Sequence, residues 1–126
     1  MRRRLWVWGP AVAMMALIFG ISSLSQAPIP DGMTDHAGHG IGYALLSALI
    51  FRALAGASWQ GVTLGRGALS VVYSVLYGMT DEWHQSFVPG RSPAWDDVAA
   101  DFRGALVGAA FVLILHIINR LWPTKT

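Results

Sequence analysis

Four apolar segments, each about as long as a membrane span, occupy most of this chain. They cover residues 5–24, 37–57, 67–87 and 102–122. A helix needs about 20 predominantly apolar residues to cross the hydrocarbon core of a bilayer. Only short loops and tails remain between the segments, so successive helices run in opposite directions. The sequence therefore predicts an all-α, polytopic membrane protein: four transmembrane helices in an antiparallel bundle, forming a single domain over residues 1–126.

The composition supports a membrane location. Hydrophobic residues make up 54% of the 126 residues and charged residues 13%, whereas a soluble domain carries roughly 25% charged residues. A soluble chain of this size has too little interior to bury so much apolar surface. The chain has no cysteine, which excludes disulfides, thiolate nucleophiles and cysteine-ligated metals. Its net charge is only +2 and its basic residues form no stripe, so we expect no nucleic-acid partner.

The first apolar segment has two interpretations. Three arginines, an apolar run and the small residues around Gln26 resemble a cleavable signal peptide. The run is longer than the usual signal core of about 7–15 residues, however. It also contains Trp6, Trp8 and Pro10. We therefore expect this segment to be retained as the first span.

The basic residues predict the orientation. Lysine and arginine are enriched in the cytoplasmic loops of membrane proteins. With a cytoplasmic N-terminus, the inner ends of the segments hold seven basic residues: Arg2, Arg3, Arg4, Arg52, Arg66, Arg120 and Lys125. The outer side then holds only Arg91 and Arg103. We expect a multi-pass protein of the plasma membrane with both termini in the cytoplasm.

Polar residues gather at the predicted outer ends of the last three segments. Residues four apart share one face of a helix, which groups Asp35, His39 and Tyr43 on the second segment. The same rule groups Asp97 with Asp101 on the fourth. The candidate polar site comprises Asp35, His39, Tyr43, Asp81, Glu82, Gln85, Arg91, Asp97 and Asp101. Such residues are costly at membrane depth and normally face a bundle interior or a watery cavity.

Structural explanations account for part of this pattern. Aspartates favour helix N-termini through the helix dipole, and tyrosines and tryptophans anchor helices at the membrane interface. Gly104 and Gly108, in a GxxxG spacing, are predicted to allow close helix packing. The dipole disfavours Asp81 and Glu82, however, because they lie near a helix C-terminus. We expect Arg91 to fold back and pair with one of these two acids.

The chemistry of this cluster stays open at the sequence level. Asp35 or Asp81 can orient His39 as a carboxylate orients a catalytic imidazole, so the candidate catalytic residues are His39, Asp35 and Glu82. Zinc accepts the nitrogen and oxygen ligands offered by Asp35, His36, His39, Glu82 and His84. The chain has no HExxH motif, and we expect neither a metal nor another cofactor.

Three stretches of the sequence resemble the VanZ-like membrane family. They are Asp35-x3-His39-x3-Tyr43, Asp81-Glu82-x2-Gln85-x-Phe87-x-Pro89-Gly90-Arg91 and Asp97-x3-Asp101-x2-Gly104-x3-Gly108. The resemblance covers nearly all of the chain after the first segment. This sequence has His36 where the family commonly has lysine, and Asp101 where asparagine is usual. The resemblance implies a small polytopic membrane protein of the cell envelope, and the family's namesake is associated with teicoplanin resistance.

Three functions compete at this stage. The first is binding of an amphiphile, such as a lipoglycopeptide or a lipid headgroup, at the outward-facing polar site. The second is an integral-membrane enzyme acting on a lipid-linked or headgroup substrate, so enzymatic activity is left open. The third is a small oligomeric transporter or flippase. All three make membrane lipids the immediate partners, and the sequence leaves oligomerisation undecided.

Overall fold

The computed structural model describes residues 1–122 and consists of four long helices and one short 3-10 turn. The helices are α1 (Arg2–Ser22), α2 (Asp35–Leu54), α3 (Leu64–Gln85) and α4 (Trp95–Leu121), with the 3-10 turn η1 at Trp59–Gly61. No strand occurs within these residues, so the prediction of an all-α fold is confirmed. Lys125, which entered the orientation argument, lies outside the described residues.

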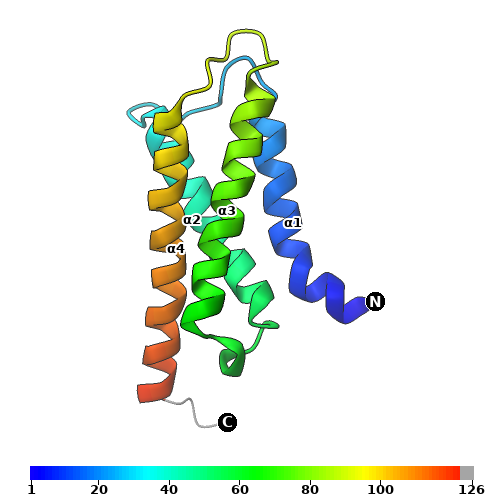
Figure 1. Ribbon diagram of the computed structural model, residues 1–126, viewed down its shortest axis with the longest axis vertical. Coiled ribbons are helices and arrows are strands. Elements are labelled where there is room, and N and C mark those ends of the chain that lie inside the picture. The colour runs from blue at the N-terminus through cyan, green and yellow to red at the C-terminus, as the bar shows by residue number, and fades with distance from the viewer. Residues whose placement is uncertain (123–126) are drawn as a thin grey trace.

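The helices pack side by side and alternate in direction along the chain (Figure 1). The α1–α2 and α3–α4 loops therefore lie at one end of the bundle, and η1 lies at the other. Side-chain caps begin two of the helices: Thr34 accepts a hydrogen bond from the Ala37 N–H, and Thr63 accepts one from the Arg66 N–H. Such caps satisfy backbone donors that have no partner within a helix.

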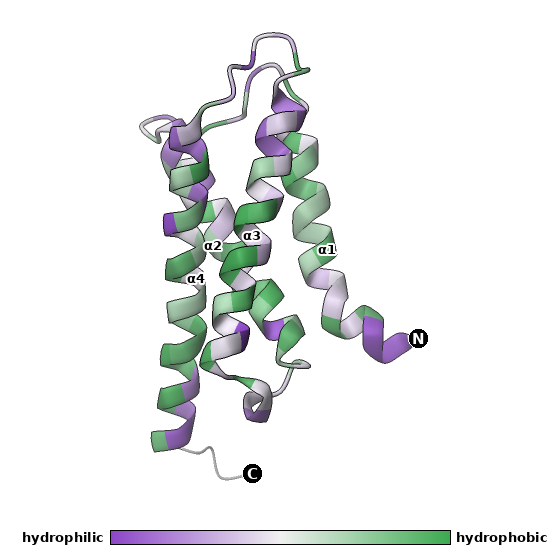
Figure 2. Ribbon diagram, in the orientation of Figure 1, coloured by the Kyte–Doolittle hydropathy of each residue, from purple (hydrophilic) through white to green (hydrophobic). Residues whose placement is uncertain are grey.

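Three of the helices, α1, α2 and α4, are long and apolar enough to cross a membrane. Figure 2 shows hydrophobic residues along the middle of the helices and hydrophilic residues towards their ends. The helix α3, predicted from sequence as an equivalent segment, is not among these three. The helices also differ in extent from the apolar runs. α4 begins at Trp95 rather than at residue 102, because its polar first two turns continue the helix beyond the hydrophobic run.

The two faces of α3 are reversed relative to a helix of a soluble protein. Its buried residues are mainly small or polar: Gly67, Ser70, Val71, Ser74, Gly78, Asp81, Glu82 and Gln85. Its exposed residues include large hydrophobic ones: Leu69, Val72, Tyr73, Leu76, Met79 and Trp83. A helix on the surface of a soluble protein turns its apolar stripe to the core and its polar face to water. The arrangement in α3 is the one expected for a helix surrounded by lipid.

Small residues allow α2 and α4 to approach closely. A Cβ atom at Gly104 would overlap the carbonyl oxygen of Gly40, and one at Gly108 would overlap that of Ala44. The two glycines are one turn apart on α4, so both face α2. Backbone contact of this kind is typical of helix pairs in membranes. It sets the separation of α2 and α4 near the α1–α2 and α3–α4 loops, which positions the polar residues that both helices carry there.

Arg52 stabilises a bend in α1. Proline has no N–H, so Pro10 cannot bond the carbonyl four residues earlier and kinks its helix. Arg52 donates from Nη1 to that Trp6 carbonyl at 3.1 Å and to the next one at 3.2 Å. Its guanidinium also lies over the Trp6 ring. The first turns of α1 bend away from the bundle in Figure 1, and Arg52 connects them to α2.

Candidate functional site

A histidine and an aspartate connect α2 to α4 at the loop end of the bundle. His39 Nδ1 lies 2.9 Å from Asp101 Oδ1, and Asp101 is fully buried. Because an ionised carboxylate only accepts hydrogen bonds, Nδ1 carries the donated hydrogen, and in the neutral imidazole Nε2 then carries a lone pair. The expected orienting residues were Asp35 and Asp81, and this expectation was wrong. Asp101 reaches His39 because the close packing of α2 and α4 brings them together.

A second histidine–aspartate contact lies nearer the surface. His36 Nδ1 is 2.9 Å from Asp97 Oδ1, within ion-pair distance but outside hydrogen-bond geometry. His36 is exposed and Asp97 is buried. Asp35, also exposed, brings a carboxylate oxygen close to the ligand atoms of His39 and Asp97. These last three residues are the group in the described chain with donor atoms close enough to hold one metal ion.

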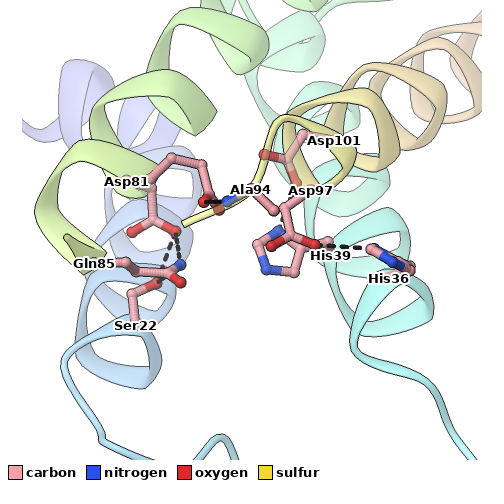
Figure 3. Close-up of polar contacts among 9 residues, drawn as sticks. Ser22, His36, His39, Asp81, Gln85, Ala94, Asp97 and Asp101 are labelled. Carbon is pink, nitrogen blue, oxygen red and sulfur yellow. Dashed lines mark hydrogen bonds and ion pairs between the residues drawn. The ribbon is translucent and has the colours of Figure 1, made fainter. Parts of the chain in front are cut away.

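A separate network connects α1 to α3. Ser22 Oγ donates to Asp81 Oδ2 at 2.7 Å, and Gln85 Nε2 donates to the same oxygen at 3.1 Å. All three side chains are buried. Figure 3 shows this network on one side of the site, with His36, His39, Asp97 and Asp101 on the other. Three elements thus contribute predicted polar residues to one region, and α1 adds Ser22.

Glu82 joins α3 to the beginning of α4. Its Oε2 accepts a hydrogen bond of 3.0 Å from the backbone N–H of Ala94, which is the N-cap residue of α4. The carboxylate therefore lies near the positive end of the α4 dipole, where an anion is stabilised. This interaction explains part of the cost of burying Glu82 near the C-terminus of its own helix.

Arg91 does not pair with either acid as expected. Its Nε donates to the Leu24 carbonyl at 2.9 Å and its Nη2 to the Ile21 carbonyl at 3.3 Å. These carbonyls lie at the C-terminal end of α1, where backbone acceptors lack partners within the helix. The α3–α4 loop carries Arg91 over the end of α1, so the guanidinium caps that helix. The expected pair with Asp81 or Glu82 was wrong.

The buried acids are consequently short of partners. Asp81 Oδ1, Glu82 Oε1 and Asp101 Oδ2 are buried and accept no hydrogen bond. The Tyr43 hydroxyl, also buried, has no partner. Within residues 1–122, no lysine or arginine forms an ion pair with any of these carboxylates. Buried polar atoms without partners are costly, and four of them are concentrated in this region.

A cavity of about 180 Å³ brings the two networks together with an apolar wall. Its polar end includes Asp35, His39, Tyr43, Asp81, Gln85 and Arg91. Its apolar wall comes from α1 and the α1–α2 loop: Met14, Leu17, Ile18, Ile21, Pro28, Ile29, Pro30 and Met33. Asp97 lines an adjoining surface hollow together with Asp35 and Gln85. Glu82 lines a different hollow, between α3 and α4.

Several residues of this site had no distinct signal in the sequence. Ser22 is an ordinary serine at the end of an apolar run. Gly78 lies opposite Asp101, and a Cβ there would come within 2.5 Å of Asp101 Oδ2. His84, one of the possible zinc ligands, instead lies against α1, with Nε2 3.0 Å from Ser23 Oγ and its ring stacked on Phe19. The packing of α3 against α1 and α4 decides these contacts.

The comparison with known protein families gives one result. The sequence model of the VanZ/LLP1 family matches residues 11–116, which is most of the chain. The chain therefore belongs to the VanZ/LLP1 family and is a VanZ-like membrane protein. The resemblance expected from the three sequence stretches is confirmed. No curated protein and no solved structure matches the sequence.

Proposed function

We propose that all four helices cross the plasma membrane as an antiparallel bundle with both termini in the cytoplasm. The reversed faces of α3 support a fourth span, because its exposed hydrophobic residues suit lipid and its polar residues are buried between the other helices. The excess of arginine at the η1 end supports the orientation. In this arrangement the polar site faces the outside of the cell.

The site is proposed to bind an amphiphile. The observation that carries this proposal is the single cavity in which the apolar wall of α1 meets the polar end at Asp35, His39 and Asp81. Ligand sites are typically apolar, with a few polar groups that fix orientation. An acyl chain suits the α1 wall and a headgroup suits the polar end. A lipid headgroup and a lipoglycopeptide are the two occupants considered, and teicoplanin susceptibility is the cellular readout that the family's namesake suggests.

Gly42 offers a direct test. It lines the cavity, and a Cβ atom there would meet nothing within 4 Å. Gly42→Leu should therefore fill the cavity without disturbing the fold, since leucine also favours a helix more than glycine does. Native mass spectrometry of gently extracted protein should detect a co-purified lipid in the parent and much less of it in the variant.

Gly20→Leu is the matched control. Gly20 has equally open space around its Cβ position but does not line the cavity. It should retain lipid as the parent does. Equal lipid retention by Gly42→Leu and the parent would refute binding in this cavity.

The geometry of His39 favours an enzyme as a second candidate. A histidine oriented by a buried carboxylate, with its other nitrogen free, is the arrangement of a general base. His39→Gln preserves hydrogen bonding but removes proton transfer. If the protein is an enzyme, the His39→Gln variant should keep the melting temperature of the parent but lose the cellular phenotype. If the protein only binds a ligand, the variant should lose function only in part. Full function of His39→Gln in cells lacking the gene would refute the enzyme.

A further inference from the structure

Three ligand atoms converge at the mouth of the polar site. Asp35, His39 and Asp97 each place one oxygen or nitrogen so that all three lie within 4.8 Å of one another. A tetrahedral ion with bonds of about 2.1 Å holds its ligands about 3.4 Å apart. The Asp35 side chain is exposed, so it is the member of this group with the most room to move towards an ion.

His39 is already prepared as a metal ligand. In the neutral ring, donation from Nδ1 to Asp101 leaves the lone pair on Nε2, directed away from that aspartate. Metal-binding histidines almost always donate their second ring N–H to a carboxylate or a carbonyl, and this bond fixes the tautomer and raises the basicity of the ligand. Asp101, fully buried on α4, supplies that bond.

The buried acids provide an independent indication of a cation. Asp97 is only 6% exposed, and its Oδ1 makes no hydrogen bond, although the exposed His36 Nδ1 lies 2.9 Å away. Asp81, which lines the same cavity as Asp35 and His39, is 4% exposed and has its Oδ1 without a partner. Arg91 lines the same hollow as Asp97 but donates to α1 carbonyls. Burying carboxylates with so few partners is unfavourable, and a bound cation would offset that cost.

We propose that Asp35, His39 and Asp97 form a binding site for one divalent transition-metal ion of the zinc or manganese type. One imidazole and two carboxylates suit these ions better than magnesium or calcium, which prefer oxygen ligands alone. Three protein ligands also leave coordination positions open. Those positions face the cavity, which Asp35 and His39 both line. The ion would therefore contact the headgroup of an occupant, but its own binding does not depend on any amphiphile.

The test uses the purified full-length chain in detergent micelles, stripped with a chelator and then titrated with Zn²⁺ or Mn²⁺ alone. Isothermal titration calorimetry and elemental analysis should find one ion per chain. His39→Gln and Asp97→Asn should each lower the affinity at least about 100-fold. Asp101→Asn, which removes only the orienting carboxylate, should weaken binding by about 10–100-fold.

Asp96→Asn is the matched control, because Asp96 is exposed and precedes Asp97 on the same helix. It should bind the ion as the parent does. Asp35→Asn is a second test of the site, because Asp35 is exposed and its substitution should not prevent folding even if a buried variant fails to fold. The absence of stoichiometric binding in the parent would overturn the metal site, as would unchanged affinity in Asp35→Asn and His39→Gln. The lipid measurement on Gly42→Leu is separate, so failure of either proposal is recognised independently.

Discussion

Alanine at Gly104 and Gly108 should force α2 and α4 apart. At both positions a Cβ atom would overlap a carbonyl oxygen of α2, so the helices must separate by about 1 Å to accept one. A gap of about 0.5–1 Å forfeits a quarter to a half of the dispersion energy of each contact along the interface. Overpacking typically costs about 1–3 kcal/mol. The overlapped atoms belong to the backbone, which cannot move aside as a side chain can, so the cost lies in the upper part of this range. Alanine recovers up to about 1 kcal/mol of helix propensity, so each variant should lose about 1–2 kcal/mol of unfolding free energy.

The double variant gives the sharper result. One separation of the helices relieves both overlaps, because the two glycines lie one turn apart on the same face. The cost of Gly104→Ala combined with Gly108→Ala should therefore be clearly less than the sum of the single costs, as expected for coupled sites. Reversible unfolding in mixed detergent micelles measures all three free energies. Gly20→Ala, at a position with open space, is the control and should not destabilise the protein.

Two outcomes would refute this reasoning. Single variants as stable as the parent would mean that α2 and α4 are not in backbone contact at these positions. Strictly additive costs would mean that each alanine is accommodated by its own local change rather than by a common separation.

Further predictions concern topology and two arginines. A cysteine at Ala94 should react with an impermeant thiol reagent in intact cells while one at Gly65 should not, and labelling at Gly65 alone would invert the proposed orientation. Arg91→Ala should cost only about 1 kcal/mol in thermal or chemical unfolding, because its bonds to α1 are exposed and screened; a loss of about 3–5 kcal/mol would instead indicate a buried ion pair. Arg52→Leu should lower the free energy of unfolding by about 1–3 kcal/mol, because it leaves the Trp6 carbonyl without a donor. Unchanged stability would show that water or lipid headgroups donate to this carbonyl instead.

The sequence alone was sufficient to predict the helical class. The sequence contains four apolar runs of span length and leaves no room for a soluble domain. Both observations depend only on composition and length, and together they predicted the four helices. Helical periodicity also predicted which residues share a face. It grouped His39 with Tyr43, whose rings lie parallel on α2. The family resemblance rested on similarly local patterns, and the family comparison confirmed it.

The partners of the polar residues were decided by the tertiary structure. Periodicity fixes the direction of a side chain relative to its own helix, but it does not fix the rotation or the separation of the neighbouring helix. The contact of Gly104 with α2 determines that separation, and it brings Asp101 rather than Asp35 or Asp81 to His39. The pairing depends on packing between two helices, and it joins residues that are 62 positions apart in the sequence.

Loop paths decided the remaining contacts. Arg91 lies six residues after Gln85, and chain length alone allows it to reach several acceptors. The α3–α4 loop passes over the end of α1, so Arg91 meets the free carbonyls there rather than the buried acids. Asp81 is then left with Ser22 and Gln85 as its partners. The sequence predicted which polar residues share a helix face, but only the packing of four helices determined which of them are buried, as Asp81 is and Asp35 is not, and which found partners.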